Sequence, residues 1–244
     1  MGKKKKEVSA VTETAVEQSA NHLSYRINLK CKNQRQKELV NTIKNNDITI
    51  VEGVFGVGKT FVINSVALDL LKDENSGIKK ILFLVPTISN SNSMSLGYLP
   101  GNLDDKIYNF AANELDAMKK ILEKSGNLKP ETIVDDLIKD GRLDIKPICF
   151  LRGASLSDAF ICVSEAEQFT KEDLFLIITR FESGKMVISG DPLQTDRKEV
   201  KNGNSGLLHA MERLKDINGV GTVKFEDTDI VRNDILYDIY QKWK

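Results

Sequence analysis

Apolar and polar residues alternate along this chain in two kinds of segment. Short apolar runs, such as residues 81–85 and Ala159–Val163, have the length of strands that are buried on both faces of a parallel sheet. Between these runs, apolar residues recur every three or four positions, which predicts helices with one buried face. The predicted strands cover residues 47–52, 79–86, 145–151, 159–163, 185–189 and 220–225, and the predicted helices cover residues 34–44, 59–72, 103–124, 130–140, 171–181, 206–215 and 235–243. This order indicates an α/β fold in which helices flank a mostly parallel sheet.

The first 25 residues have a different composition. Residues 3–6 are all lysine, Glu, Ser, Thr and Ala predominate after them, and no aromatic residue precedes Tyr25. So few apolar groups cannot offset the entropy lost on ordering the chain. We therefore predict a mobile tail over residues 1–25. Because no internal repeat and no linker rich in Pro, Gly or Ser follows, we predict a single domain over residues 26–244.

Charge and hydropathy exclude several classes of protein. The 244 residues include 35 Lys and Arg and 35 Asp and Glu, so the formal net charge is +0. This balance excludes a strongly basic nucleic-acid-binding module, and the aromatic residues form no stripe that would stack bases. Direct RNA binding is therefore not visible in the sequence. No apolar run reaches the roughly 18 residues that a membrane span needs. The N-terminal lysines precede no hydrophobic core of a secretion signal, so we expect a cytoplasmic protein without membrane contact.

Residues 53–60 match the pattern G-x-x-x-x-G-K-[ST] of a phosphate-binding loop. A predicted strand ends at Glu52 and a predicted helix begins at Lys59, which is the context that the motif requires. Glycines let the backbone wrap a triphosphate, and the helix N-terminus adds partial positive charge. We expect Lys59 to reach the β- and γ-phosphates and the Thr60 hydroxyl to ligate Mg²⁺. The residues expected to bind the nucleotide here are Gly53, Val54, Phe55, Gly56, Val57, Gly58, Lys59, Thr60 and Phe61.

Polar residues follow the predicted strand 159–163 directly, beginning with Ser164 and Glu165. In P-loop enzymes the end of a neighbouring strand carries acids that hold the metal and the attacking water. Ser164 stands where an Asp would anchor Mg²⁺, and Glu165 stands at the position of the general base. A hydroxyl is neutral where a carboxylate would supply charge, so we expect weaker Mg²⁺ binding or slow hydrolysis. A Ser164→Asp variant is then expected to tighten the Mg²⁺ dependence or raise the rate.

A second polar segment follows the predicted strand 185–189. Residues 190–194 read Gly-Asp-Pro-Leu-Gln, and superfamily-one helicases carry this G-D-x-x-Q arrangement as the element that reads the γ-phosphate. We therefore expect Gln194 to act in catalysis and Asp191 to contact the nucleotide. Asp191 is also expected to join Thr60 and Glu165 as a metal ligand.

Several further stretches resemble one family, the PhoH-like P-loop ATPases, across about residues 30–244. They are residues 47–49 (Asp-Ile-Thr), 96–101 (Leu-Gly-Tyr-Leu-Pro-Gly), 151–156 (Leu-Arg-Gly-Ala-Ser-Leu), 205–207 (Ser-Gly-Leu) and 229–232 (Asp-Ile-Val-Arg). The resemblance implies a RecA-like ATPase core that uses ATP with Mg²⁺, cytoplasmic residence, ring-shaped oligomers of six subunits, and a link to RNA. The chain departs from the family at Ser164, at Val85 where Arg is usual, and at Asn233 where His is common. Such drift suits a viral or mobile-element copy of the gene, whose product would work in the host cytoplasm.

Four more polar residues are candidates for the nucleotide site. Gln36 matches a family Gln whose amide would hydrogen-bond the adenine edge; the alternatives are a surface Gln without this role, or Gln34 in its place. Arg152, Arg180 and Arg232 are candidates to meet phosphate charge, and each would equally serve in a structural ion pair. Arg232 is the strongest candidate for catalysis, and Arg180 is a candidate to contact the nucleotide.

The length of the chain after Gln194 bears on assembly. Only about 50 residues remain, too few for a second RecA-like sheet. One domain leaves a side of the triphosphate open to water, so we expect a neighbouring copy in a homo-oligomeric ring to close the site by donating Arg232, Arg180 or Arg152. Two functions stay open: an ATP-hydrolysing motor or switch, and a nucleotide-gated assembly protein that hydrolyses little because of Ser164. An RNA-processing helicase subunit rests on family analogy alone.

Overall fold

The computed structural model describes residues 23–86 and 103–243, with side chains omitted for residues 103–111 and 234. Its strands are β1 (Ile48–Glu52), β2 (Lys80–Val85), β3 (Leu143–Pro147), β4 (Ala159–Val163), β5 (Gly184–Gly190) and β6 (Val220–Lys224). Its α-helices are α2 (Gln34–Asn45), α3 (Lys59–Lys72), α4 (Leu103–Lys124), α5 (Pro130–Lys139), α6 (Lys171–Ile178), α7 (Lys198–Lys201), α8 (Gly206–Leu214) and α9 (Asp234–Trp243). Among these helices, none is both long and apolar enough to cross a membrane.

The six strands form one sheet in the order β3-β2-β4-β5-β1-β6, and every neighbouring pair is parallel. The predicted α/β class with a RecA-like sheet is therefore confirmed. Parallel strands end at the same edge, so the residues that follow β1, β4 and β5 lie together at the carboxyl edge of the sheet. Glu52 at the end of β1 is in register with Gly190 at the end of β5.

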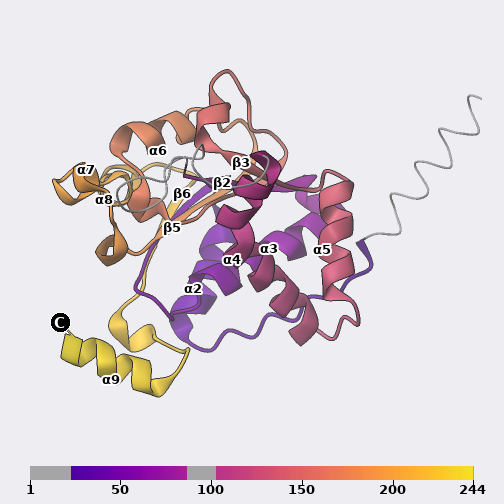
Figure 1. Ribbon diagram of the computed structural model, residues 1–244, viewed down its shortest axis with the longest axis horizontal. Helices are drawn as coiled ribbons and strands as arrows, with labels where there is room; N and C mark the ends of the chain where they lie inside the picture. Colours follow the sequence, from indigo (N-terminus) through magenta and orange to yellow (C-terminus); the bar gives the residue numbers. More distant parts are fainter. Residues whose placement is uncertain (1–22, 87–102, 244) are drawn as a thin grey trace, which may run out of the picture.

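Helices cover both faces of the sheet (Figure 1). On one face α2, α3, α4 and α5 enclose a core that contains Leu39, Leu68 and Met118. On the other face α6 and α8 enclose a second core around Phe169 and Ile177. Because strand side chains alternate between faces, the near-continuous apolar strands contribute to both cores at once.

Three elements differ from the sequence predictions. The predicted strand 145–151 is a shorter strand, β3, followed by a 3₁₀ turn over Ile148–Leu151, because Pro147 cannot donate a further ladder hydrogen bond. The helix predicted to run to residue 181 ends at Ile178, and Phe181 instead forms a bridge with Leu156. The short helix α7 was missed because four residues carry no detectable period.

The N-terminal part of the described chain packs on the domain. Tyr25 is buried, and its hydroxyl donates to the Leu68 carbonyl at 2.8 Å. The backbone N–H of Asn28 donates to the Ser125 hydroxyl at 2.9 Å, which joins this segment to the end of α4. Tyr25, the last residue of the predicted tail, thus belongs to the folded domain. The predicted tail over residues 1–22 and the Leu-Gly-Tyr-Leu-Pro-Gly stretch lie outside the described residues.

Candidate nucleotide-binding site

The phosphate-binding loop connects β1 to α3, as its sequence predicts. Gly56 and Gly58 adopt φ values of 75° and 88°, in the left-handed region that side chains disfavour. A Cβ atom at Gly53 would lie 2.8 Å from Cβ of Phe225, so packing also demands glycine there. Gly58 caps α3 without a side chain, so no capping group competes for the N–H groups of the first helical turn. This geometry suits an anion at the helix N-terminus.

Lys59 lies over its own loop. Its Nζ donates to the Gly53 carbonyl at 2.5 Å and to the Val54 carbonyl at 3.0 Å. Burial lowers the pKa of Lys59, and the negative charges of Asp191, Glu167 and Glu165 oppose this effect. The lysine therefore lies near the acids that follow β4 and β5, as the sequence predicts for Glu165 and Asp191.

Glu165 and Glu167 form a pair of carboxyl groups after β4. Glu165 is exposed and has a left-handed backbone, with φ of 54°, which is a strained conformation for a residue with a side chain. Glu167 is 2% exposed, and burial raises its pKa to about 8, with a hydrogen bond to Glu165 as the next cause. Both effects favour the protonated form of Glu167, in which it donates a hydrogen bond to Glu165. Sequence analysis missed Glu167, although its position two residues after Glu165 was visible.

The Gly-Asp-Pro-Leu-Gln turn is organised by Asp191, which is 6% exposed. Its Oδ2 accepts a hydrogen bond from Gln194 Nε2 at 2.7 Å, and its Oδ1 accepts from the Leu193 N–H at 3.1 Å. The Asp191 N–H donates to Glu167 Oε2 at 3.0 Å, which joins the turn to the glutamate pair. A Cβ atom at Gly190 would collide with the same Glu167 oxygen. The ends of β4 and β5 therefore form one connected acidic cluster.

Gln36 braces the loop from α2. Its side chain is buried, its Nε2 donates to the Val57 carbonyl at 2.8 Å, and its Oε1 accepts from the Lys32 N–H at 2.7 Å. Both ends of the amide therefore have backbone partners within the chain. The expected contact with the adenine edge stays a prediction.

A cavity of about 560 Å³ opens beside the loop and carries five cationic side chains. We call it the cationic pocket; its lining residues are Asn28, Lys30, Lys32, Gln36, Gly56, Gly58, Lys59, Thr60, Phe61, Lys124, Val231 and Arg232. Arg232 reaches this pocket because the Val231 N–H donates to the Gly56 carbonyl at 3.0 Å. Arg232 thus lies beside the loop of its own chain, which was not expected of an arginine donated to a neighbouring subunit.

The other two arginines lie elsewhere. Arg180 precedes β5, so it lies at the amino edge of the sheet, opposite the phosphate-binding loop. The structure therefore does not bring it to the nucleotide site of its own chain. Arg152 is exposed after the 3₁₀ turn that follows β3, the strand at the far end of the sheet from β6. Any phosphate contact by either residue would require a second copy.

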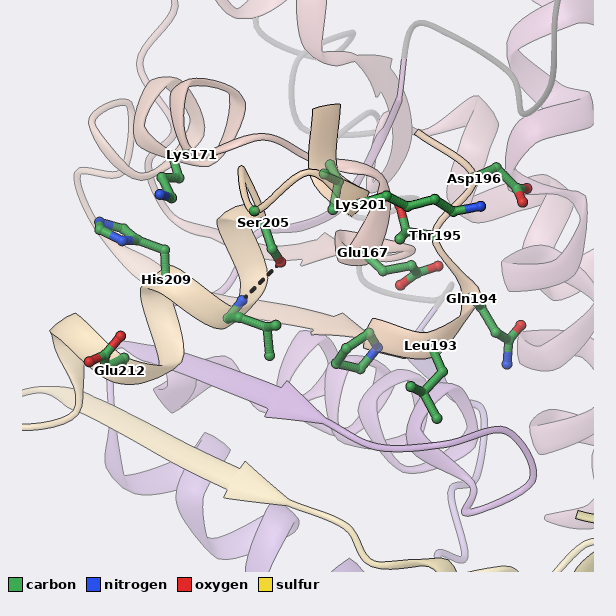
Figure 2. Close-up of a pocket in the computed structure, with 14 residues that line it drawn as sticks. Glu167, Lys171, Leu193, Gln194, Thr195, Asp196, Lys201, Ser205, His209 and Glu212 are labelled. Carbon is green, nitrogen blue, oxygen red and sulfur yellow. Dashed lines mark hydrogen bonds between the residues drawn. The ribbon is translucent and has the colours of Figure 1, made fainter. Parts of the chain in front are cut away.

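A second cavity, of about 690 Å³, is lined in part by Pro192, Leu193 and Gln194 of the Gly-Asp-Pro-Leu-Gln turn. Figure 2 shows Gln194 and Asp196 at one end and Lys171, His209 and Glu212, from helices α6 and α8, at the other. Glu167 also lines it, so the cavity adjoins the acidic cluster. Its residues come from four separate segments, and no sequence motif indicated it.

The oxygen groups near Lys59 suit Mg²⁺. Thr60, Glu165 and Asp191 supply oxygen atoms, which Mg²⁺ prefers, and Mg²⁺ is usually held by one or two protein carboxylates plus phosphate and water. Among the described residues, no group of three or more His, Cys, Asp or Glu forms a metal cage of its own. Asn64 Oδ1, one helical turn beyond Thr60, is buried and has no hydrogen-bond partner within the described chain. Thr60, Glu165 and Asp191 are therefore the residues that could hold Mg²⁺ beside a bound phosphate.

The fold and the site together define a P-loop nucleotide-binding protein. A glycine loop joins a central parallel strand to a helix, a partly buried lysine begins that helix, and an acidic cluster lies at the same sheet edge.

Comparison with known proteins gives the family. The family model "PhoH-like protein" matches residues 28–244, and the chain belongs to this family. It is 33% identical over 217 residues to a PhoH-like protein of Bacillus subtilis and 31% identical over 217 residues to one of Synechocystis, covering 88% of this chain in both cases. It is 26% identical to Protein PhoH of Escherichia coli over 206 residues, 83% of this chain and 54% of that protein.

The chain spans 62–64% of the length of the first two relatives. Among solved structures, the helicase domain of Pyrococcus furiosus Hef aligns with a TM-score of 0.44 at 16% identity, over 80% of this chain and 38% of that chain.

Proposed function

We propose that this protein is a Mg²⁺-dependent ATPase that acts as a ring-forming motor or switch. The observation that carries the proposal is the position of Lys59, which lies between a glycine loop with free helix N–H groups and a cluster of carboxyl groups. A phosphate binds well to the first group, and a metal and an attacking water bind well to the second.

Each residue then has a defined task. Lys59 exchanges its two carbonyl partners for the β- and γ-phosphates, and Thr60 and Asp191 hold Mg²⁺, which neutralises phosphate charge when it is bound. Glu165 is exposed and accepts the proton of the attacking water. Glu167 orients Glu165 by donating to it. Gln194, whose amide is fixed by Asp191, contacts the γ-phosphate.

The cationic pocket receives the rest of the nucleotide. Its lysines and Arg232 attract the triphosphate, and Phe61 offers an apolar face with Lys124 Nζ 5.2 Å from its ring centre. Gln36 holds the phosphate-binding loop in place beside this pocket through its hydrogen bond to the Val57 carbonyl. In this arrangement Arg232 meets phosphate charge within its own chain.

Assembly and location belong to the same proposal. Glu165 and Gln194 are exposed at the carboxyl edge, so a second copy placed there would exclude water from the reacting phosphate. We expect a homo-oligomeric ring, with six subunits by analogy with the family, located in the cytoplasm and acting on RNA or an RNA-bound partner. Of the three arginines that the sequence singles out, Arg152 and Arg180 lie away from the site of their own chain and are the two that we propose for donation across such an interface.

A second function is supported by Ser164. If the hydroxyl holds Mg²⁺ poorly, ATP binds and drives assembly with little turnover. The two functions differ in one measurement, the rate of ATP hydrolysis by the assembled protein.

The test uses the purified full chain. ATP turnover is measured with and without Mg²⁺ and with and without RNA, and mass is measured by native mass spectrometry with and without ATP. The proposal predicts Mg²⁺-dependent turnover and an ATP-dependent oligomer. Binding and assembly without turnover would favour the assembly protein, and absence of ATP binding would refute both.

A further inference from the structure

A buried carboxylate lies beside Ser164. Glu114, in α4, is 7% exposed. Its Oε2 accepts a hydrogen bond from Asn64 Nδ2 at 2.7 Å, and its backbone carbonyl accepts from the same nitrogen at 3.4 Å. Burial raises the pKa of Glu114, and a hydrogen bond with the Ser164 side chain opposes this effect, which puts the Ser164 hydroxyl within reach of the same carboxyl group. Side chains from α3, from α4 and from the end of β4 therefore meet at Glu114.

This meeting point lies next to the expected metal position. Asn64 follows Thr60 by four residues in α3, so the two share one face of the helix. Ser164 follows Val163, the last residue of β4. In a P-loop site Mg²⁺ lies between the threonine hydroxyl and the acid at the end of such a strand. Glu114 is thus held between the helix that carries Thr60 and the residue that replaces the metal-anchoring aspartate.

Helix packing alone does not favour a carboxyl group at position 114. The neighbouring α4 residues Leu115 and Met118 are buried and apolar, and leucine at position 114 would avoid the desolvation of a carboxyl group. Within the described residues, no Lys, Arg or His forms a salt bridge with Glu114, and burial raises its pKa. Asn64 Oδ1, in the same cluster, is buried without a hydrogen-bond partner among the residues that the structure describes. Polar groups buried at such cost concentrate at functional sites.

We propose that Glu114, acting through Ser164, supplies the negative charge that position 164 lacks and thereby positions Mg²⁺ in the nucleotide site. The hydrogen of the Ser164 hydroxyl is directed to Glu114, which leaves the lone pairs of its oxygen to accept from a water molecule of hydrated Mg²⁺. Glu114 is a positioning residue in this scheme and does not touch the metal. The inference rests on the proposed function, since it requires a Mg²⁺–nucleotide complex at the loop.

The proposal reverses the expectation for Ser164→Asp. An aspartate at position 164 would meet Glu114 in a largely buried site, and one of two adjacent carboxyl groups then keeps its proton. The single substitution should therefore bring no gain in Mg²⁺ affinity. Glu114→Gln alone should weaken the Mg²⁺ dependence of ATP binding. Adding Ser164→Asp to it leaves one carboxylate in the cluster and should restore the Mg²⁺ dependence of the parent.

The test is a Mg²⁺ titration of ATP binding by the full chain, followed with a fluorescent ATP analogue. Glu114→Gln and Ser164→Ala are each expected to raise the half-saturating Mg²⁺ concentration by about tenfold, the usual effect of removing a group that orients a metal ligand. Their combination should give the same shift as either alone, because both break one chain of hydrogen bonds. Glu123→Gln, an exposed glutamate on the same helix, is the matched control and should leave the titration unchanged.

The outcomes separate this inference from the proposed function. If the parent binds no ATP in the presence of Mg²⁺, the proposed function fails. If the parent binds ATP and a folded Glu114→Gln variant keeps the parental Mg²⁺ dependence, the inference is overturned while the function stands. Thermal unfolding establishes that each variant folds; should Glu114→Gln fail to fold, Ser164→Ala decides by the same criterion. Failure of the Ser164→Asp, Glu114→Gln double variant to restore the dependence would overturn the role of position 164.

Discussion

The two halves of the candidate site are built in different ways. The phosphate-binding half comes from one continuous segment, residues 53–60, whose shape depends on the backbone of its glycines. The metal-and-water half is assembled from side chains on α3, α4 and the ends of β4 and β5. A backbone-built site tolerates few substitutions, because a side chain cannot replace a positive φ angle. A site built from side chains can move a charge from one element to another, as we propose for Glu114 and Ser164.

The largest expected effect comes from a substitution that disables only the phosphate-binding half of the site. Lys59→Ala removes the partly buried cation that we propose to meet the β- and γ-phosphates, so ATP affinity or turnover should fall by at least about 100-fold. The acidic cluster keeps its own hydrogen bonds, so the fold should persist in circular dichroism and thermal unfolding. Lys120→Ala, an exposed lysine on α4, is the control. ATP affinity and rate unchanged in folded Lys59→Ala would refute the phosphate-binding loop.

The metal-and-water half of the site should make the stability of the fold depend on pH. Burial raises the pKa of Glu167 above its ordinary value of 4.5 to about 8, so between these values the folded chain keeps a proton that the unfolded chain has lost. Stability therefore falls as pH rises through this window, by roughly 2–4 kcal/mol, and levels off above it. Urea unfolding at pH 5 to 9 measures this slope. Glu167→Gln should flatten it; an equal slope in that variant would show that other groups cause it.

A substitution at Gly190 tests whether crowding the acidic cluster affects turnover more than ATP binding. At Gly190 an added Cβ meets Glu167, with its backbone nitrogen 2.8 Å away, and also the Leu207 side chain. Gly190→Ala should lower the free energy of unfolding by about 1–3 kcal/mol and displace the acidic cluster. ATP binding should weaken less than turnover, since Gly190 contacts the phosphate-binding loop through one backbone hydrogen bond, from the Gly53 N–H to its carbonyl at 3.2 Å. Gly203→Ala, in open space but at a positive φ, is a control for backbone strain.

The smallest effect concerns whether Arg232 works in its own chain. Lys59→Ala and Arg232→Ala chains are mixed, and ATP turnover is compared with each variant alone. Because both residues line the cationic pocket of one chain, mixing should restore no activity. Recovery of activity in the mixture would place Arg232 in the site of a neighbouring subunit instead.

The sequence predicted the fold well because helices and buried strands follow from local periodicity. The predicted ends of two elements were wrong because they depend on contacts between distant residues. Strand β3 ends at Pro147, and Phe181 lies outside helix α6 and pairs with Leu156. The phosphate-binding loop was equally predictable, since its chemistry lies in eight consecutive residues.

Two residues of the metal-and-water half, Glu114 and Glu167, were not predictable from the sequence. Glu114 lies 50 residues from both Asn64 and Ser164, and only the packing of α3, α4 and β4 brings the three together. Glu167 joins Glu165 because the left-handed backbone at Glu165 turns the chain back on itself. Neither contact leaves a period or a motif in the sequence. Assembly, RNA contact and location stay predictions.

The most direct test of hydrolysis at this site compares the parent with Glu165→Gln at saturating ATP and Mg²⁺. The exchange keeps the size of the side chain but removes the group that accepts the proton of water. The account predicts Mg²⁺-dependent turnover by the parent, and nucleotide binding with a rate at least about 100-fold lower in the variant. Glu131→Gln, an exposed acid on α5, should match the parent. Equal rates of ATP hydrolysis in the parent and Glu165→Gln would contradict the account.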